Sequence, residues 1–443
     1  MGVLRSGPNA RRCGRKPEPF CHRAGAPAWH DSGMAEARTL STDCCVVGGG
    51  PAGMLLALLL ARTGARVTVL EKHADFLRDF RGDTVHPSTL EVLDQIGLME
   101  RFAELPHRRE RELSVQFADG MLAVADFGRL ERYPYLAFVP QWDFLDLLAS
   151  EARRFDGFEL RMRSEAQDLL FEGDVVAGVR AKDDQGDLSV RAKIVVAADG
   201  RNSVLREAAG FHPVALGAPM DVLWFRLPRA PQDPDASFGI AGRGQLLAVI
   251  HRGDYWQIGF IVAKRAVAGL RTAPIESFQA TVARAAPVFA DRARVLSSWE
   301  AVKRLEVRVD YLKRWFRPGL LFIGDAAHAM SPIGGVGINL AIQDAVAAAN
   351  ALGPALRAGQ VPGSDVLAQV QKRRQLPARL IQTLQVFVQR VVIARALGAA
   401  GDPPRAPRLL RALLRLRAVR SIPARVFGLG FRRERVAFTA RQS

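Results

Sequence analysis

The sequence has few cysteines and no long apolar run. Cys44 and Cys45 fall in a predicted buried strand, and Cys13 and Cys21 lack the C-x-x-C spacing of metal or redox pairs. The longest unbroken apolar stretch, Met54–Ala61, is far shorter than the roughly 20 residues needed to cross a bilayer. These absences exclude a disulfide scaffold. They predict a cytoplasmic protein with no metal site and no transmembrane helix.

Acidic residues are scarce at the two ends of the chain. The net charge is +17, a value that by itself would indicate nucleic acid or an anionic membrane as a partner. Residues 372–443 carry 17 Lys and Arg against Asp402 and Glu434, and residues 1–33 carry six against two, so the remainder is close to neutral. We expect no nucleic-acid partner, because no aromatic or glycine interleaving accompanies the charge. Residues 1–33 lack a secretory apolar segment and are interpreted as a disordered extension, or as a segment upstream of a natural start at Met34.

Hydrophobic periodicity predicts an α/β fold with an inserted antiparallel sheet. A Leu- and Ala-rich helix at 51–62 lies between strands at 42–47 and 66–70, which is a βαβ opening. The triplet at 252–254 predicts a hairpin turn. Further strands are expected at 194–197, 222–227, 245–251, 255–262 and 320–323, and helices at 89–97, 141–155 and 336–352. The last 80 residues are expected to be helical, punctuated by Pro377, Pro403-Pro404 and Pro423.

A glycine motif joins the first strand to the first helix. The sequence GGGPAG at 48–53 has the spacing G-x-G-x-x-G. Gly48 permits a tight turn, Gly50 lets backbone amides approach a pyrophosphate, and Gly53 lets the helix and strand pack closely. Glu71 ends the second strand, where a carboxylate can accept hydrogen bonds from a ribose hydroxyl. The pattern predicts a dinucleotide site without separating FAD from NAD.

Two further motifs follow predicted strands. The strand at 194–197 leads into Asp199 and Gly200, and the strand at 320–323 leads into Gly324 and Asp325. Carboxylates at the carboxyl ends of strands lie on the usual ligand edge of an open α/β sheet. After Asp325 comes a glycine loop, SPIGGVGIN at 331–339, which opens a helix whose positive end can hold negative charge.

With these three motifs in order, residues 42–355 resemble the class A flavoprotein monooxygenases typified by para-hydroxybenzoate hydroxylase. The resemblance implies a doubly wound, glutathione-reductase-like FAD domain, an inserted antiparallel substrate sheet and a helical C-terminal region. It implies FAD contacts by Glu71, Arg81, Gln141, Asp199-Gly200 and Asp325, alongside the glycines Gly48, Gly50, Gly53, Gly324 and Gly337 and Asn339. The expected domains are FAD-binding at 34–115, 141–215 and 305–355, substrate sheet at 116–140 and 216–304, and helical region at 356–443.

The resemblance also implies a reaction. NADPH or NADH would reduce FAD, O2 would add at flavin C4a, and the hydroperoxide would oxygenate an aromatic or polyketide-like small molecule. Pro332, Gly334 and Gly335 would frame the reacting pocket, and the helix opening near Val336 would stabilise negative charge on the flavin. A non-oxygenating reductase or saturase stays an alternative. A halogenase is disfavoured because the W-x-W-x-I-P pattern is absent.

The substrate residues and the basic end leave alternatives open. Trp224 and Trp256 could line the substrate site or be core aromatics. Residues 407–422 predict a basic amphipathic helix that could lie on an anionic membrane. We favour the alternative, in which this helix packs its leucines on the FAD domain while its arginines stay in solvent. A flavin-binding protein acting at a membrane surface is therefore a further alternative, and the protein is expected to be a monomer or homodimer.

Overall fold

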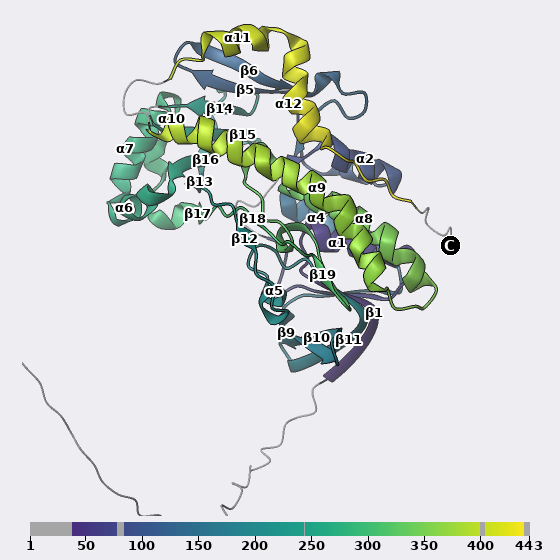
Figure 1. Ribbon diagram of the computed structural model, residues 1–443. Helices are drawn as coiled ribbons and strands as arrows, with labels where there is room; N and C mark the ends of the chain where they lie inside the picture. The colour runs from purple at the N-terminus through teal and green to yellow at the C-terminus, as the bar shows by residue number, and fades with distance from the viewer. Residues whose placement is uncertain (1–37, 78–83, 243, 399–403, 438–443) are drawn as a thin grey trace, which may run out of the picture. The chain divides into compact units, whose positions relative to one another are not determined.

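The computed structural model describes residues 38–77, 84–242, 244–398 and 404–437, and Figure 1 shows how they are arranged. The predicted extension at 1–33 lies outside these residues. A largely parallel sheet, sheet 1, follows the order β20-β11-β1-β2-β8, with β19 antiparallel at the β20 edge. Its strands are β1 Arg38–Val47, β2 Val67–Leu70, β8 Phe158–Arg161, β11 Gly186–Ala197, β19 Phe316–Arg317 and β20 Leu320–Phe322. The mixed α/β class is as predicted.

Helix α1 (Pro51–Ala61) is buried on every side. Ten of its eleven residues are buried, from Ala52 to Ala61, which explains its unbroken apolar sequence. It shares one hydrophobic core with sheet 1, α4 (Gln141–Ala152) and α8 (Gly337–Arg357). Cys44 and Cys45 are fully buried thiols in β1, as expected.

Sheet 1 also carries an antiparallel extension. The predicted strand at 194–197 is the end of the longer β11, whose first half pairs with β10 (Val175–Asp183), and β10 pairs with β9 (Glu165–Glu172). Shorter pairings surround this core. They are β3 Thr84–Val85 with β7 Leu136–Phe138, β7 with β4 Arg108–Glu110, and β12 Val214–Ala215 with β18 Asp310–Tyr311.

A second sheet, sheet 2, follows the order β17-β13-β16-β15-β14-β5-β6. Its strands are β5 Glu112–Phe117, β6 Gly120–Asp126, β13 Met220–Pro228, β14 Phe238–Ala241, β15 Leu246–His251, β16 Tyr255–Ala263 and β17 Lys303–Leu305. The predicted hairpin turn is confirmed, because Arg252 N donates to Tyr255 O at 3.0 Å between β15 and β16. An antiparallel sheet was predicted, but one pair of neighbouring strands, β14 and β5, runs parallel.

Short helices connect these elements. They are α2 Pro87–Gln95, α3 Met99–Glu104, α5 Val204–Ala208, α6 Val267–Thr272 and α7 Ile275–Ala285. Helix α7 buries Phe278 and Val282 in the core of sheet 2. Figure 1 shows α6 and α7 together at the β13–β16 side of that sheet.

The C-terminal region is helical, and its prolines divide it only in part as predicted. Pro404 lies in a non-helical segment before the helix that begins at Arg408, while Pro403 lies outside the described residues. Pro377 lies inside α9 (Ser364–Val388), and Pro423 lies inside α12 (Arg417–Leu429). At Pro377, which is among the buried residues of α9, packing outweighs the backbone hydrogen bond that the proline removes. A π-helical turn at Gln389–Ile393 leads into α10 (Ala394–Gly398).

The single helix predicted at 407–422 is two helices. Helix α11 (Arg408–Arg415) ends before Leu416, which has extended backbone and precedes α12. The break lets α11 lie on β6 while α12 turns along β6 toward α2. In the part of the chain that the structure describes, none of the helices has the length and apolarity to cross a membrane.

Candidate active site

The three predicted motifs and Glu71 meet at one edge of sheet 1. The glycine motif follows β1, Glu71 follows β2, Asp199 follows β11, and Asp325 follows β20. These four strands are neighbours in the order β20-β11-β1-β2 and run parallel. Their carboxyl ends therefore bring the three motifs and Glu71 together, at the ligand edge of this type of sheet.

The glycines of the first motif are required by close backbone contacts. A Cβ on Gly53 would lie 2.0 Å from the Gly48 carbonyl oxygen, and a Cβ on Gly48 would lie 2.4 Å from the carbonyl oxygen of Ala198. Gly50 differs, because no described atom lies within 4 Å of its Cβ position. It precedes α1, whose first turn no described side chain caps. The amides at this helix end therefore have no described capping side chain, and the space beside Gly50 is open, which suits a pyrophosphate.

Glu71 is held beside the glycine motif. Its Oε2 accepts a 2.9 Å hydrogen bond from Gly49 N, and its Oε1 accepts one of 3.1 Å from His73 N. The His73 ring also contacts Oε1. These contacts fix the carboxylate at the end of β2, next to the mouth of the glycine turn.

Asp199 and Asp325 are linked through one arginine. Arg201 donates to Asp325 Oδ2 at 3.0 Å, so the motif after β11 contacts the motif after β20. Asp199 Oδ2 accepts from Leu205 N at 3.3 Å, and burial raises the pKa of this carboxyl. Gly200, between Asp199 and Arg201, has a φ of 82°, a backbone conformation that favours glycine.

Behind the Asp325 turn lies a buried ionic cluster that the sequence reasoning missed. Asp344 in α8 accepts from Gly324 N at 3.0 Å, contacts His328 Nε2 at 2.6 Å and accepts from Arg374 Nε at 2.9 Å. Burial raises the pKa of Asp344, but His328 and Arg374 outweigh it and the net shift is downward. An acid within the apolar pattern of α8 was the available signal. The cluster fixes His328 and the Gly324 turn in place.

The glycine loop before α8 is in contact with the C-terminal helix α12. Gly334 and Gly335 have φ values of 76° and 63°. A Cβ on Gly334 would lie 2.8 Å from Cδ1 of Phe427 in α12, and one on Gly335 would lie 2.9 Å from Oγ1 of Thr84. Pro332 precedes this turn, and its carbonyl accepts from Gly335 N at 3.1 Å. Phe427 therefore packs directly on the loop, which no local sequence pattern indicated.

His86 also contacts this loop. Its Nε2 donates to the carbonyl of Gly335 at 3.1 Å, and the ring is buried. Burial lowers the pKa of His86 to about 4, so the imidazole is neutral near pH 7. A neutral, buried ring that bonds to the backbone positions the loop.

The remaining predicted cofactor residues have different surroundings. Gly337 begins α8, and Asn339 Oδ1 accepts from Ser88 Oγ at 2.9 Å and from Thr89 Oγ1 at 2.6 Å, joining α8 to α2. Gln141 is the half-buried first residue of α4. Arg81 lies outside the described residues.

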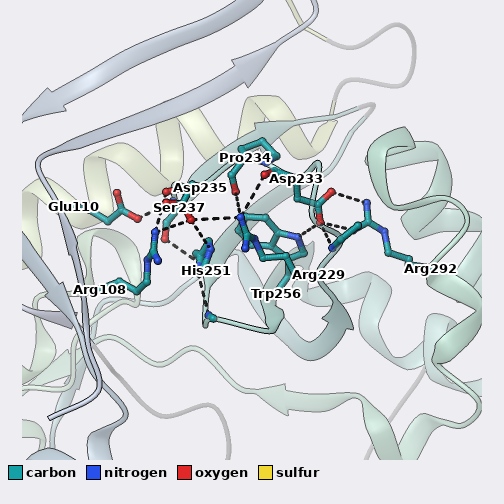
Figure 2. Close-up of polar contacts among 12 residues, drawn as sticks. Arg108, Glu110, Arg229, Asp233, Pro234, Asp235, Ser237, His251, Trp256 and Arg292 are labelled. Atoms are coloured by element: carbon teal, nitrogen blue, oxygen red, sulfur yellow. Dashed lines mark hydrogen bonds and ion pairs between the residues drawn. The ribbon is translucent and has the colours of Figure 1, made fainter.

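Trp256 is part of the core of sheet 2. Its side chain is fully buried, and its indole Nε1 donates to Asp233 Oδ2 at 2.8 Å, within the polar network of Figure 2. Arg292 donates to the other carboxylate oxygen at 3.1 Å. Burial raises the pKa of Asp233, but Arg292 and the other donors outweigh it and lower it to about 2. Trp256 is therefore a core residue of sheet 2, with a buried ring and a satisfied indole N–H.

Trp224 lies in a different environment. It is partly exposed, and its ring covers Gly259 on the neighbouring strand, where an added Cβ would lie 2.9 Å from the indole. It also packs against the hydrophobic cluster that includes Ala424 of α12. Helix α12 therefore contacts the Trp224 cluster through Ala424 and the glycine loop through Phe427.

Comparisons with known proteins agree with this geometry. The family model described as "FAD binding domain" matches residues 41–383. The chain is 34% identical to 6-methylpretetramide 4-monooxygenase of Streptomyces rimosus, over 87% of this chain and 92% of that protein. It is 31% identical to rifampicin monooxygenase of Streptomyces venezuelae, over 68% of this chain and 62% of that protein.

Solved structures share the fold. An anhydrotetracycline hydroxylase from Streptomyces rimosus superposes with a TM-score of 0.68 at 26% identity, covering 88% of this chain and 76% of that one. PqsL of Pseudomonas aeruginosa superposes with a TM-score of 0.69 at 23% identity, covering 81% of this chain and 99% of that one. The second likeness concerns the fold alone.

Proposed function

The chain belongs to the FAD-binding-domain family of aromatic-hydroxylase-like flavoprotein monooxygenases, and from this premise we propose that it hydroxylates a polyketide-like aromatic molecule with NAD(P)H and O2. The proposed substrate class rests on one observation, the match over most of both chains to 6-methylpretetramide 4-monooxygenase. The buried, unpaired thiols Cys44 and Cys45 support a reducing compartment, so we place the activity in the cytoplasm.

The described residues fit FAD. The open space at Gly50 and the uncapped amides of α1 would receive the pyrophosphate. Glu71 would accept from the adenosine ribose, and Asp325 would accept from the ribityl hydroxyls beside its Arg201 partner. Asp199 and Gly200 would lie between FAD and the pyridine nucleotide. Each assignment uses a group that already faces the same sheet edge.

The loop at 332–337 would control charge near the flavin ring. Bound FAD accepts a hydride from NAD(P)H and activates O2. The first amides of α8, at Gly337 and after it, point from a 21-residue helix and would stabilise negative charge that develops beside them. His86 donates to the Gly335 carbonyl, and Phe427 packs on Gly334, so these two contacts preorganise the loop. The titratable His86 ring positions the loop without exchanging a proton.

Sheet 2 would supply the substrate wall. Of the two predicted substrate residues, Trp224 is the better candidate, because its side chain is partly exposed. Helix α12 contacts both the Trp224 cluster and the glycine loop. The indole face of Trp224 would stack on a planar aromatic substrate. The second residue, Trp256, has its polar atom engaged and its ring buried.

Substrate-dependent NAD(P)H oxidation tests the proposal. Protein saturated with FAD is mixed with NADPH or NADH and a panel of polycyclic phenols under ¹⁸O₂. We expect one substrate to accelerate NAD(P)H oxidation and to gain one labelled oxygen atom. A product that gains only hydrogen would identify a reductase, and a halogenated product formed with added halide would identify a halogenase. Either result would overturn the proposed monooxygenase activity.

A matched pair of tryptophan variants tests the substrate wall. Trp224→Ala should raise the KM for the substrate about tenfold, the loss expected when an aromatic contact worth roughly 1–2 kcal/mol is removed. Trp256→Phe should lower thermal stability and leave KM unchanged. The assignment fails if the two variants exchange these effects.

A further inference from the structure

Helix α11 exposes an apolar face. Leu409, Leu413 and Leu416 are 73%, 45% and 60% exposed, and Leu410 is 40% exposed. Leu409 and Leu413 lie at i and i+4 and are therefore side by side on α11, and Leu416 follows directly after the last residue of the helix. We call these four residues the leucine surface. Contiguous exposed leucines of this kind mark an interaction site on soluble proteins.

The opposite side of α11 is anchored to sheet 2. Leu414 is buried with Leu122 of β6, and Arg411 pairs with Asp119 at 2.8 Å. Ala406 N also donates to Asp119 Oδ1 at 3.1 Å. Figure 1 shows α11 on the outer side of β6. The anchoring fixes the rotation of the helix, so the leucine surface faces away from the protein.

Arginines surround the leucine surface. Arg405, Arg408, Arg415 and Arg417 are exposed, and none of them pairs with an acid among the residues that the structure describes. The nearby acids are already neutralised from the inner side, Asp119 by Arg411 and Glu112 by Arg420 at 2.8 Å. The outer face of α11 is therefore apolar at its centre and positive at its edge.

We propose that the leucine surface docks on the surface of an anionic lipid bilayer. The leucines would enter the boundary between headgroups and acyl chains, and the four arginines would contact the phosphates. A second copy of the chain fits less well, because a two-fold interface through this face would bring two sets of unpaired arginines together. Charge complementarity therefore selects the bilayer. This proposal stands independently of the catalytic one.

Vesicle flotation of the full-length, FAD-loaded protein tests the proposal. The vesicles are phosphatidylcholine alone or phosphatidylcholine mixed equally with phosphatidylglycerol. We expect flotation with the mixed vesicles and little with phosphatidylcholine alone, and release as salt is raised from low to molar concentration. Failure of the parent protein to float with mixed vesicles would overturn the proposal without any variant being made.

Two sets of variants assign the contact. Replacing Leu409, Leu413 and Leu416 together with Gln should weaken binding more than tenfold. Replacing Arg408, Arg415 and Arg417 together with Gln should weaken it about fivefold for each charge removed. The matched control replaces Val361, Leu376 and Phe387 with Gln, since these are 62%, 65% and 59% exposed on other surfaces. It should bind like the parent.

Two outcomes would contradict the assignment. Equal vesicle binding by the leucine variant and the parent would show that general basicity, and not the leucine surface, makes the contact. A concentration-dependent dimer in sedimentation that the leucine variant abolishes, with no vesicle binding by the parent, would assign the face to a second copy. Circular dichroism and the thermal midpoint check that each variant is folded.

Discussion

Alanine at Gly50 should separate FAD binding from folding. Gly50 has φ −76° and ψ −177°, a conformation open to alanine, and no described atom lies within 4 Å of the new Cβ. Alanine is a poorer helix cap than glycine, but it also reduces the entropy of the unfolded chain. These two effects oppose each other, so the free energy of unfolding of the apoprotein should change by less than about 1 kcal/mol.

The same methyl group should strongly weaken FAD binding. It would occupy the space through which a pyrophosphate approaches the first amides of α1. Loss of two charge-assisted hydrogen bonds, each worth about 1.5–3 kcal/mol, corresponds to a loss in affinity of more than about 100-fold. Quenching of flavin fluorescence during titration of the apoprotein measures the Kd, and urea unfolding followed by circular dichroism measures stability.

Two other glycines serve as controls. Gly269→Ala, in α6, also meets no described atom within 4 Å and should leave FAD affinity unchanged. Gly53→Ala should instead damage the fold itself, because its Cβ would lie 2.0 Å from the Gly48 carbonyl oxygen. Parent-like FAD affinity in a folded Gly50→Ala protein would refute the reasoning, since the pyrophosphate would then lie elsewhere.

Three further predictions concern stability. The pKa of His86 is about 4 when folded, against about 6.5 for an ordinary histidine, so the unfolded chain binds the extra proton. Stability should therefore fall by up to about 3 kcal/mol as the pH drops from 6.5 to 4, and urea melts of His86→Gln should show less of this loss. Arg374→Met leaves the buried Asp344 carboxylate without its guanidinium partner and should cost about 3–5 kcal/mol in the same assay; an exposed Arg357→Met change should cost little. Trp256→Phe removes a buried N–H donor and should lower the free energy of unfolding by about 1–3 kcal/mol.

The sheet edge was predictable because its determinants are local. The spacing of Gly48 and Gly53 encodes a close approach between a strand and a helix, and the structure has that approach. Asp199 and Asp325 each follow a short apolar strand, and parallel pairing of β11 and β20 places them at one edge. Periodicity and turn chemistry suffice to place such motifs.

The contacts made by the C-terminal helices were not predictable in the same way. Phe427 packs on Gly334, and Arg374 reaches Asp344, only because separate helices cross α8 and its loop. The alternation of Arg and Leu at 407–422 indicated one continuous helix, yet the chain turns at Leu416. The expectation that the leucines pack on the FAD domain is wrong, because Leu414 is the one buried leucine of α11 and it packs on β6 of sheet 2. Tertiary packing determines where these helices end and what they contact, and the helical periodicity of the sequence does not encode it.

The position of α12 has a consequence for synthesis of the protein. β1, α1 and β2 are close in sequence, and β1 can pair with β2 early in translation. Gly334 comes into contact with Phe427 only after that residue, which lies much later in the chain, has left the ribosome and folded back. In a nascent chain β1, α1 and β2 are therefore complete well before the loop at Gly334 gains its contact with α12. Maturation would then depend on the order in which two distant parts of one chain emerge.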